Sequence, residues 1–400
     1  MENDRIGVTK SAAQEMTLKA GLVGCGGRGT GAAEQCMNSA PNVQLVAMAD
    51  MFPDRLKKSR RQLAALKHDG FKVTDATCFT GFDAIKRLLD SGVDIVLLAT
   101  PPGFRPMQFE MAVEAGKHVF MEKPCGVDPV GCRKVMEVGE KARQKKLGVA
   151  AGTQYRHQVS FQETMKRIHE GAIGEVLGGR IYYNTGTVWS QPRKDDQTDM
   201  EWQLRNWLYF TWLSGDQIIE QHVHTIDVMC WLMKGHPIKA TGVGGRQVRV
   251  EPEYGNVWDH FCVDFEFPNE VHVLSMCRQM ANCSLYVGAN FVGSKGAVDP
   301  YQAEITGANP WKTPEKPNIS RAYIQEHADL VESIRKGQPI NEAAQLAEST
   351  MAGVLGREAA YTGQVVTWEQ ISKSDLCLMP EKLEMGPIAM PPVAMPGKKK

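Results

Sequence analysis

Residues 18–29, LKAGLVGCGGRG, decide how the first part of this chain folds. The apolar run Leu18–Val23 predicts a strand, and residues 32–37 predict the helix that follows it. The last six residues satisfy the GxGxxG spacing, in which glycines permit a tight turn and a close approach of the main chain to a pyrophosphate. Glycine-rich turns are common, so this pattern alone is weak evidence for a nucleotide site. The residues that it predicts to bind a dinucleotide are Gly24, Gly26, Gly27, Arg28 and Gly29.

The segments that follow alternate between strand and helix patterns. Further strands are predicted at residues 43–50, 93–100, 118–121 and 148–151, and helices at residues 53–68, 106–115 and 129–145. The run 93–100, VDIVLLAT, is apolar almost throughout, as expected for a strand buried on both faces. Repeated strand–helix–strand units of this length predict an α/β domain with a doubly wound parallel sheet over residues 17–150.

The second predicted strand, VQLVAMAD, ends in Asp50. A carboxylate at this place can accept hydrogen bonds from the ribose hydroxyls of a dinucleotide. It would repel the 2′-phosphate of NADP, and Met51 and Phe52 supply no cation, so NAD is favoured as the cofactor. Arg28 and Arg55 keep NADP open as the less favoured cofactor, and an Asp50 that only caps the next turn is the structural alternative.

After residue 150 the pattern changes. Helices are predicted at residues 161–170, 218–233, 323–336 and 341–362, and strands at residues 176–184, 240–250, 260–267, 270–279 and 284–293. Alternating strands of this kind predict a large, mostly antiparallel sheet with one face covered, and hence a C-terminal α+β domain over residues 151–377. Residues 185–213 look like a loop with four tryptophans, and the proline-rich residues 378–400 look like an extended tail.

A charged pair followed by proline, Glu122-Lys123-Pro124, ends the strand at residues 118–121. Ligands bind at the carboxyl ends of the strands in open parallel sheets. Lys123 could donate a hydrogen bond to a substrate hydroxyl or transfer a proton, and the proline could fix the turn through a cis bond. The alternative is an ordinary surface Glu–Lys pair.

Acidic and imidazole side chains recur in the predicted helix at residues 218–233. Glu220, His224 and Asp227 are spaced i, i+4 and i+7, which places all three on one helix face. A carboxylate one turn from an imidazole could orient it and raise its basicity, as a base that deprotonates a hydroxyl requires. A divalent-metal site and a purely structural polar cluster are the alternatives, and His222 points elsewhere.

These landmarks together resemble the Gfo/Idh/MocA family, which includes glucose–fructose oxidoreductase and inositol dehydrogenase-like enzymes. The motifs that carry the resemblance span residues 18 to about 370 and are GCGGRG, the AD that ends the second strand, ATPP, GKHVFMEKP, GDQIIEQHVHTID, GSKG, EHADLVESIRKGQP and ESTMAGVLGREAAYTG. The resemblance implies a Rossmann domain followed by an α/β domain whose open sheet builds dimers or tetramers. It also implies hydride transfer between NAD(P) and a hydroxyl carbon of a sugar or cyclitol.

Carried over by position, Lys123 and His224 would be the catalytic pair, supported by Glu220 and Asp227. Glu220 stands where many members have Asp, and His222 stands where many have Gly, so His222 would reach the substrate pocket and the identity of the base is less certain. The residues that would face the cofactor are Thr100, Pro101, Pro102, Glu122, Lys123 and Gln154, and Arg156 would face the substrate.

The tryptophan-rich stretch at residues 200–215, MEWQLRNWLYFTWLSG, looks like a feature of a subgroup. Aromatic rings pack on the C–H faces of sugars, and polar side chains bond to sugar hydroxyls. We therefore expect Arg205, Asn206 and Trp207 to contact the substrate. Core packing of these aromatic residues is the equally supported alternative.

The composition excludes several classes of protein. Among 400 residues, 46 Lys and Arg balance 46 Asp and Glu, which argues against a nucleic-acid partner and against attraction to anionic membranes. No apolar run approaches the ~20 residues of a membrane span. Residues 1–16 lack the apolar core of a secretory signal and the ten cysteines form no CxxC pair, so a cytoplasmic location is expected, with a removed export leader as the alternative.

The sequence therefore predicts an NAD(H)-dependent oxidoreductase acting on a sugar, a sugar derivative or a cyclitol, without a bound metal and as a homodimer or homotetramer. One alternative is a glycosidase in which NAD transiently oxidises a ring hydroxyl before elimination. A non-catalytic dinucleotide sensor is a further alternative, which the presence of Lys123, Glu220 and His224 disfavours.

Overall fold

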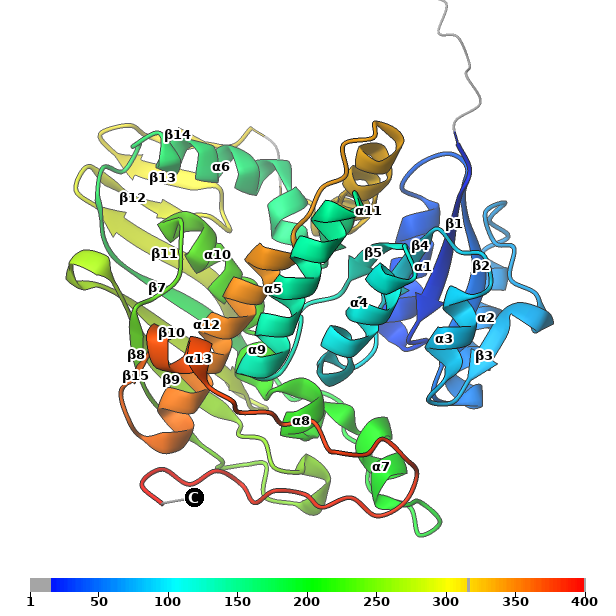
Figure 1. Ribbon diagram of the computed structural model, residues 1–400. Helices are drawn as coiled ribbons and strands as arrows, with labels where there is room; N and C mark the ends of the chain where they lie inside the picture. Colours follow the sequence, from blue (N-terminus) through cyan, green and yellow to red (C-terminus); the bar gives the residue numbers. More distant parts are fainter. Residues whose placement is uncertain (1–15, 315–316, 399–400) are drawn as a thin grey trace, which may run out of the picture.

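A computed structural model describes residues 16–314 and 317–398 of the chain, so the expectation for residues 1–15 and the last two lysines lie outside the described residues. Within this part the chain forms two sheets with helices between them (Figure 1). The first is parallel and the second is large and mostly antiparallel. The predicted fold class is confirmed.

The first sheet has the strand order β3-β2-β1-β4-β5-β6. Its strands are β1 (Leu18–Val23), β2 (Val43–Asp50), β3 (Cys78–Thr80), β4 (Ile95–Leu98), β5 (His118–Met121) and β6 (Val149–Ala151). The helices that connect or flank them are α1 (Gly27–Met37), α2 (Pro53–Ala65), α3 (Ala84–Leu89), α4 (Arg105–Glu114) and α5 (Pro129–Gln144). All residues of β4 are buried, because helices cover both faces of the sheet. The order reverses between β1 and β4, so their carboxyl ends form the crevice where ligands bind in such folds.

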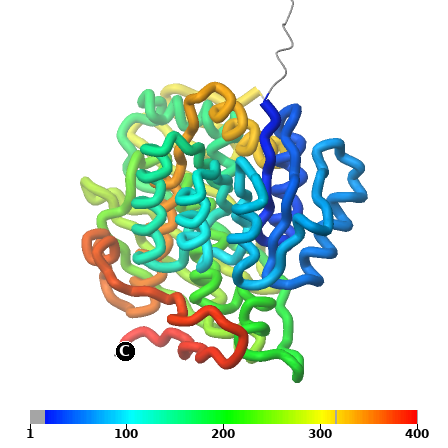
Figure 2. Tube along the Cα trace, turned by 45° about the vertical axis from the view of Figure 1, so that its right-hand side comes forward, coloured from blue at the N-terminus to red at the C-terminus, as the bar shows by residue number. Residues whose placement is uncertain are grey.

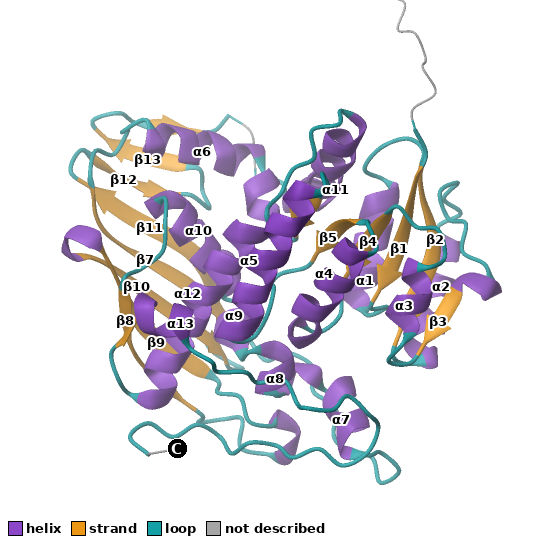
Figure 3. Ribbon diagram, in the orientation of Figure 1, coloured by secondary structure: helices purple, strands orange, loops and turns teal. Residues whose placement is uncertain are grey.

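The second sheet has the order β14-β13-β12-β11-β7-β10-β9-β8-β15. Its strands are β7 (Val176–Thr185), β8 (Lys239–Gly245), β9 (His260–Phe267), β10 (Val271–Gln279), β11 (Tyr286–Gly293), β12 (Gly296–Asp299), β13 (Glu304–Gly307), β14 (Trp311–Lys312) and β15 (Val366–Thr367). Neighbouring strands are antiparallel except β7 and β10, which pair in parallel. Strand β9 alternates buried and half-buried residues, as expected when one face is covered by helices (Figure 3).

Several helices of the C-terminal part pack between the two sheets. They are α6 (Val159–His169), α10 (Val223–Met233), α11 (Ile319–Arg335), α12 (Ala343–Thr362) and α13 (Trp368–Lys373). Helix α12 is buried over most of its length and contacts both α5 and β8. Leu330 and Val331 of α11 belong to a core cluster with residues of β1 and β2. The two sheets are therefore joined through shared packing.

Two sequence expectations fail locally. The helix predicted at residues 218–233 is split into α9 (Gln217–Glu220) and α10. Residues 185–213 are not only loop, because they contain α7 (Asp199–Arg205), a short 3-10 turn at residues 207–209, and α8 (Thr211–Ser214). The tail from residue 378 to 398 has neither helix nor strand, and it runs beside residues near 200 (Figure 2).

Candidate active site at the carboxyl ends of the parallel strands

The glycine turn between β1 and α1 has two kinds of glycine. Gly24 has φ +97°, and a Cβ there would lie 2.6 Å from the main chain of Ala99, while a Cβ on Gly29 would lie 1.8 Å from Gly24 O. These two glycines are required by the packing of the turn itself. A Cβ on Gly26 or Gly27 would meet nothing within 4 Å. The open space in front of these two residues, at a helix start without a side-chain cap, fits the close approach of a dinucleotide phosphate.

Asp50 lies at the end of β2, beside this turn. Its carboxylate accepts hydrogen bonds from Cys25 N at 2.6 Å and Phe52 N at 2.8 Å. Burial raises the pKa of Asp50 from its usual value, and the two main-chain hydrogen bonds oppose that shift. The bonds fix the direction of the carboxylate, which leaves its remaining lone pairs available for ribose hydroxyls.

Residues after β4 form the adjacent wall. The Thr100 hydroxyl donates to Gln108 Oε1 at 2.5 Å, and the buried Arg105 donates to Thr100 O at 2.7 Å. Thr100 and Pro101 line a cavity of about 1460 Å³. The predicted cofactor residues that line this cavity are Gly24, Gly26, Gly27, Arg28, Gly29, Asp50, Thr100 and Pro101, whereas Pro102, Glu122, Lys123 and Gln154 do not line it.

Lys123 follows β5 and precedes Pro124, to which it is joined by a cis peptide bond, as the sequence suggested. Its ammonium donates to the main-chain oxygen of Glu220 at 2.6 Å and lies 3.1 Å from Glu220 Oε1. Both side chains are largely buried, with 13% and 12% of their surface exposed. Lys123 is therefore a buried lysine held by Glu220, and it does not form the surface pair with Glu122 that was the alternative.

His224 is the second residue of α10 and follows Glu220 by four positions. It is buried, and its Nδ1 has no hydrogen-bond partner among the described residues. The rings of Tyr155 and Tyr183 lie 5.8 Å and 6.2 Å from the imidazole. Burial, together with the charges of Lys123 and Arg28, lowers the pKa of His224 well below its usual value. The imidazole is thus neutral and has a free nitrogen.

The predicted pairing of Glu220 and Asp227 with His224 is wrong. In the described part of the chain Glu220 bonds to Lys123, and Asp227 bonds to Arg156. The physical reason is the break between α9 and α10. The Glu220 carbonyl, which would accept from His224 N in a continuous helix, accepts from Lys123 instead, and His224 N donates to Gln221 O.

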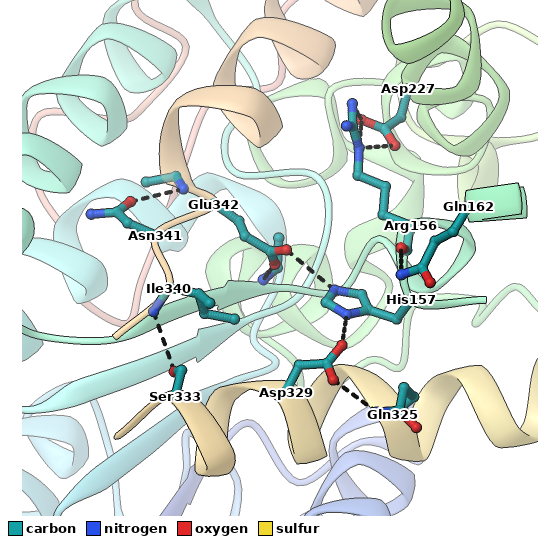
Figure 4. A network of polar contacts seen from close by, with 12 residues as sticks. Arg156, His157, Gln162, Asp227, Gln325, Asp329, Ser333, Ile340, Asn341 and Glu342 are labelled. Atoms are coloured by element: carbon teal, nitrogen blue, oxygen red, sulfur yellow. Dashed lines mark hydrogen bonds and ion pairs between the residues drawn. The ribbon is translucent and has the colours of Figure 1, made fainter. Parts of the chain in front are cut away.

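Arg156 and Asp227 form a bidentate ion pair with N–O distances of 2.8 to 3.1 Å. The Ser349 hydroxyl donates to the same carboxylate at 2.7 Å. Figure 4 shows this pair beside a second group, in which His157 contacts Asp329 at 2.6 Å and Glu342 at 3.3 Å. This arrangement pairs Asp227 with Arg156 and Ser349 instead of His224, and the substrate contact predicted for Arg156 stays a prediction.

His157 sits in an acidic environment at the end of β6. Burial opposes its charged form, but the hydrogen bonds to Asp329 and Glu342 outweigh burial and raise the pKa of His157 to about 10. The imidazole is therefore charged at neutral pH. It ties the turn after β6, which carries Gln154 and Arg156, to helices α11 and α12.

Arg28 and Glu122 connect the glycine turn with the strand end that carries Lys123. Arg28 Nε lies 2.9 Å from Glu122 Oε1, and the guanidinium lies over the Tyr323 ring at 4.8 Å. Glu122 therefore positions Arg28 at the turn.

Gln154 is buried, and its Oε1 has no hydrogen-bond partner among the described residues.

The residues predicted to bind substrate are spread over different surroundings. His222 is fully buried, and its ring nitrogens lie 2.6 Å from the hydroxyls of Ser275 and Thr225. Burial lowers its pKa to about 3. These contacts leave His222 no free ring nitrogen for the predicted substrate contact, and they fit the helix pattern, which pointed His222 away from Glu220, His224 and Asp227.

Arg205, Asn206 and Trp207 lie in different surroundings, and the substrate contacts expected of Arg205 and Trp207 stay predictions. Asn206 is fully buried, with its amide bonded to Gln191 N and Glu253 O, so it has no free group for a sugar. Arg205 bonds to Asp54 in the first turn of α2, on the nucleotide side of the cavity. Trp207 lines the same cavity. Asn206 is thus a structural residue, and Arg205 and Trp207 lie beside the Rossmann strands.

Sequence reasoning missed some residues around this site. Tyr155 and Tyr183 flank His224, and Asp54 holds Arg205. Tyr155 lies between Gln154 and Arg156, which were both predicted to face the ligands, so its position was a usable signal. Nothing in the sequence pairs Asp54 with a residue 151 positions away.

The metal alternative for Glu220, His224 and Asp227 has no support in the geometry, because the two carboxylates pair with different cations. Across residues 16–314 and 317–398, no group of three or more His, Cys, Asp or Glu side chains could hold a metal ion. In the same part of the chain, no helix has the length and apolar composition needed to cross a bilayer.

Comparison with known proteins agrees with the geometry. Residues 18–151 match the family model described as "Oxidoreductase family, NAD-binding Rossmann fold", and residues 161–299 match the GFO/IDH/MocA C-terminal domain. An inositol 2-dehydrogenase from Acidothermus cellulolyticus is 24% identical over 89% of this chain and 98% of that protein. A glycosyl hydrolase family 109 protein from Porphyromonas gingivalis is 26% identical over 80% of this chain and 68% of that protein.

Solved structures show the same fold. A scyllo-inositol dehydrogenase from Lactobacillus casei, with bound NAD(H) and scyllo-inositol, is 20% identical and has a TM-score of 0.68 over 89% of this chain and all of that chain. Together with the glycine turn, Asp50 and the Lys123 motif, these matches establish that the chain belongs to the GFO/IDH/MocA family of NAD-binding oxidoreductases.

Proposed function

We propose that this protein is an NAD(H)-dependent oxidoreductase that transfers hydride between the nicotinamide and a hydroxyl-bearing carbon of a sugar, a sugar derivative or a cyclitol. The observation that carries the proposal is the placement of Lys123, held by Glu220, and a neutral His224 beside the end of β5. The names of the inositol dehydrogenase relatives support a polyhydroxylated ring as the substrate.

The two catalytic residues have complementary properties. His224 is neutral, so its imidazole can accept the proton of a substrate hydroxyl. Lys123 donates hydrogen bonds and would stabilise the charge that develops on the substrate oxygen. The nicotinamide, when bound, supplies the hydride acceptor. Glu220 acts as a positioning residue, because it contacts Lys123 at two atoms.

The cofactor is NAD rather than NADP in this proposal. Asp50 would face the ribose, and its carboxylate would repel a 2′-phosphate. Asp54 adds a second carboxylate in the first turn of α2, and Arg205 neutralises it through an ion pair. Residues 17–150 would thus form the nucleotide-binding domain, and residues 151–377 would carry the substrate side. A lower KM for NAD than for NADP is expected in initial-rate kinetics.

A variant pair tests the catalytic assignment. His224→Ala and Lys123→Ala should each reduce turnover by at least ~10²-fold, the lower end for a general acid–base residue, while NAD binding is retained. Lys117→Ala is the matched control, because Lys117 lies just before β5 and Lys123 just after it. The substrate comes from a panel of sugars, cyclitols and glycosides, followed by absorbance of reduced nicotinamide. Near-normal turnover of either site variant would overturn the assignment.

A second candidate is an NAD-dependent glycosidase, which the similarity to the glycosyl hydrolase family 109 protein favours. Such an enzyme would cleave a glycoside without net formation of NADH, whereas a dehydrogenase would form NADH from a free sugar or cyclitol. The same panel, read once for NADH and once for released aglycone, distinguishes the two.

The open face of the second sheet suggests an assembly. Val243, Leu274 and Val292 are exposed by 67%, 38% and 54%. The pairing registers of β8, β9, β10, β7 and β11 place these three side chains on the same face, away from the helices. We infer that this face joins copies of the chain into a homodimer or homotetramer, which light scattering during size-exclusion chromatography would measure.

A further inference from the structure

Residues 199–214, which comprise α7, the turn at residues 207–209 and α8, reach across to the nucleotide side of the first sheet. The Arg205 guanidinium forms two hydrogen bonds of 3.1 Å with Asp54 and lies 3.9 Å over the Phe52 ring. Arg55 donates to the main-chain oxygen of Arg205 at 2.8 Å. Contacts with Phe52, Asp54 and Arg55 thus join this segment to the start of α2, immediately after Asp50.

An apolar cluster strengthens the same bridge. Phe52 and Phe104 of the first sheet's connections pack with Trp202, Phe210 and Trp212 of the segment. A Cβ on Gly103 would lie 2.2 Å from Trp212 O, so the main chains of the two parts are in direct contact. The segment is therefore fixed to the Rossmann strands by packing and not only by charge.

The C-terminal tail covers the outside of this cluster. Leu378, Met379, Leu383 and Ile388 pack against it, and Met200 N donates to Gly386 O at 3.0 Å. In Figure 1 the tail runs past α8 and α7. Leu383 also lines the cavity that begins at the glycine turn. Residues 199–214 and the C-terminal tail therefore form one wall of this cavity together.

That wall belongs to the same cavity as the nucleotide residues. The cavity is lined by Asp50 and the glycine turn and also by Gln191, Arg205, Trp207 and Leu383. A nucleotide whose ribose meets Asp50 would therefore lie against this wall. Its adenosine half would be enclosed by residues 199–214 and the tail.

We propose that residues 199–214 and Leu383 form a clasp over the adenosine half of the cofactor, so that the nucleotide leaves only when the Arg205–Asp54 contact opens. This proposal rests on the nucleotide site of the proposed function and adds a property to it. Release of the reduced cofactor is then the slow step that limits turnover. Asp54 is 64% exposed in its side chain, so its ion pair alone is weak, and the apolar contacts provide most of the retention.

The test measures release of NADH directly. The purified protein is loaded with NADH and mixed with excess NAD, and the loss of bound-NADH fluorescence gives the release rate. We expect release at or below ~10 s⁻¹, a typical enzyme turnover rate. Arg205→Ala should accelerate release about threefold or more, and Arg205→Ala combined with Leu383→Ser at least about tenfold. Arg61→Ala, an exposed arginine of α2 outside the cavity wall, is the matched control.

The outcomes separate the clasp from the proposed function. Circular dichroism and thermal unfolding of each variant establish that the release rate belongs to a folded protein. Release from the wild type much faster than turnover at saturating substrate, or a double variant that releases NADH at the wild-type rate, would overturn the clasp while leaving the nucleotide site intact. Failure of the wild type to bind NADH at all would overturn the proposed function itself.

Discussion

Replacing Asp227 by Asn should destabilise the protein more than it impairs chemistry. Asp227 accepts two hydrogen bonds from Arg156, at 2.8 and 2.9 Å. The side chain of Asp227 is 2% exposed and that of Arg156 is 14% exposed. Removing one partner of a buried ion pair costs about 3–5 kcal/mol, because the other charge stays buried without compensation. Asn keeps one acceptor oxygen, so we expect the lower end, about 3 kcal/mol.

Urea unfolding followed by tryptophan fluorescence measures this change. At a slope of about 3 kcal/mol per molar urea, the midpoint should fall by about 1 M. Ser349→Ala, which removes only one hydrogen bond to the same carboxylate, should cost about 1 kcal/mol. The combined variant Asp227→Leu and Arg156→Met should recover much of the loss, since neither charge remains.

A different result would restore the original assignment of Asp227 to catalysis. In that case Asp227→Asn would unfold at the wild-type midpoint while turnover at saturating substrate fell by two orders of magnitude. A turnover loss that tracks the loss of folded protein supports the structural role instead.

Two further predictions concern a charged histidine and the glycine turn. Because the folded pKa of His157, about 10, exceeds its unfolded value of ~6.5, its stabilisation is complete below ~pH 6.5 and is lost as the pH rises through about 10. The difference in unfolding free energy between wild type and His157→Gln should therefore fall over pH 7–10 by at most ~1.4 kcal/mol per pH unit. If the two proteins showed parallel curves of unfolding free energy against pH, the contact with Asp329 would be contradicted. Gly26→Ala should weaken NADH binding by at least about tenfold without lowering the thermal midpoint, because its Cβ enters only the space in front of the turn. Gly29→Ala should lower that midpoint, since its Cβ would lie 1.8 Å from Gly24 O, and equal midpoints for the two variants would refute the distinction.

The parallel sheet and its nucleotide turn could be predicted because their signals are local. Strand β1 and the glycine turn are contiguous, and the end of β2 follows within about 30 residues of the start of β1. Each strand carries its own apolar run, and each βα turn carries its own glycines or acid. A pattern confined to such a unit needs no information about distant contacts.

The tryptophan-rich segment carried a local signal that was not used. Thr198 accepts from Glu201 N at 3.2 Å and caps α7, which matches the Thr-x-x-Glu pattern of a helix start. The segment was nevertheless predicted as a loop with four tryptophans. Those aromatic side chains instead pack on Phe52 and Phe104, which lie far away in the sequence.

The break between α9 and α10 shows why the partners of the catalytic residues could not be predicted. Lys123 lies 97 positions before Glu220, yet it takes the carbonyl that a continuous helix would use. Helical spacing placed Glu220 beside His224, and that inference depends on an unbroken helix. Once Lys123 diverts the carbonyl, the carboxylate supports the lysine and leaves the imidazole free. One long-range contact therefore moves the acidic support from His224, the proposed base, to Lys123, which is proposed to stabilise the oxyanion. His224 then stays neutral because of burial and the nearby charge of Lys123, so its capacity to accept a proton depends on the folded arrangement and not on a neighbouring acid in the helix.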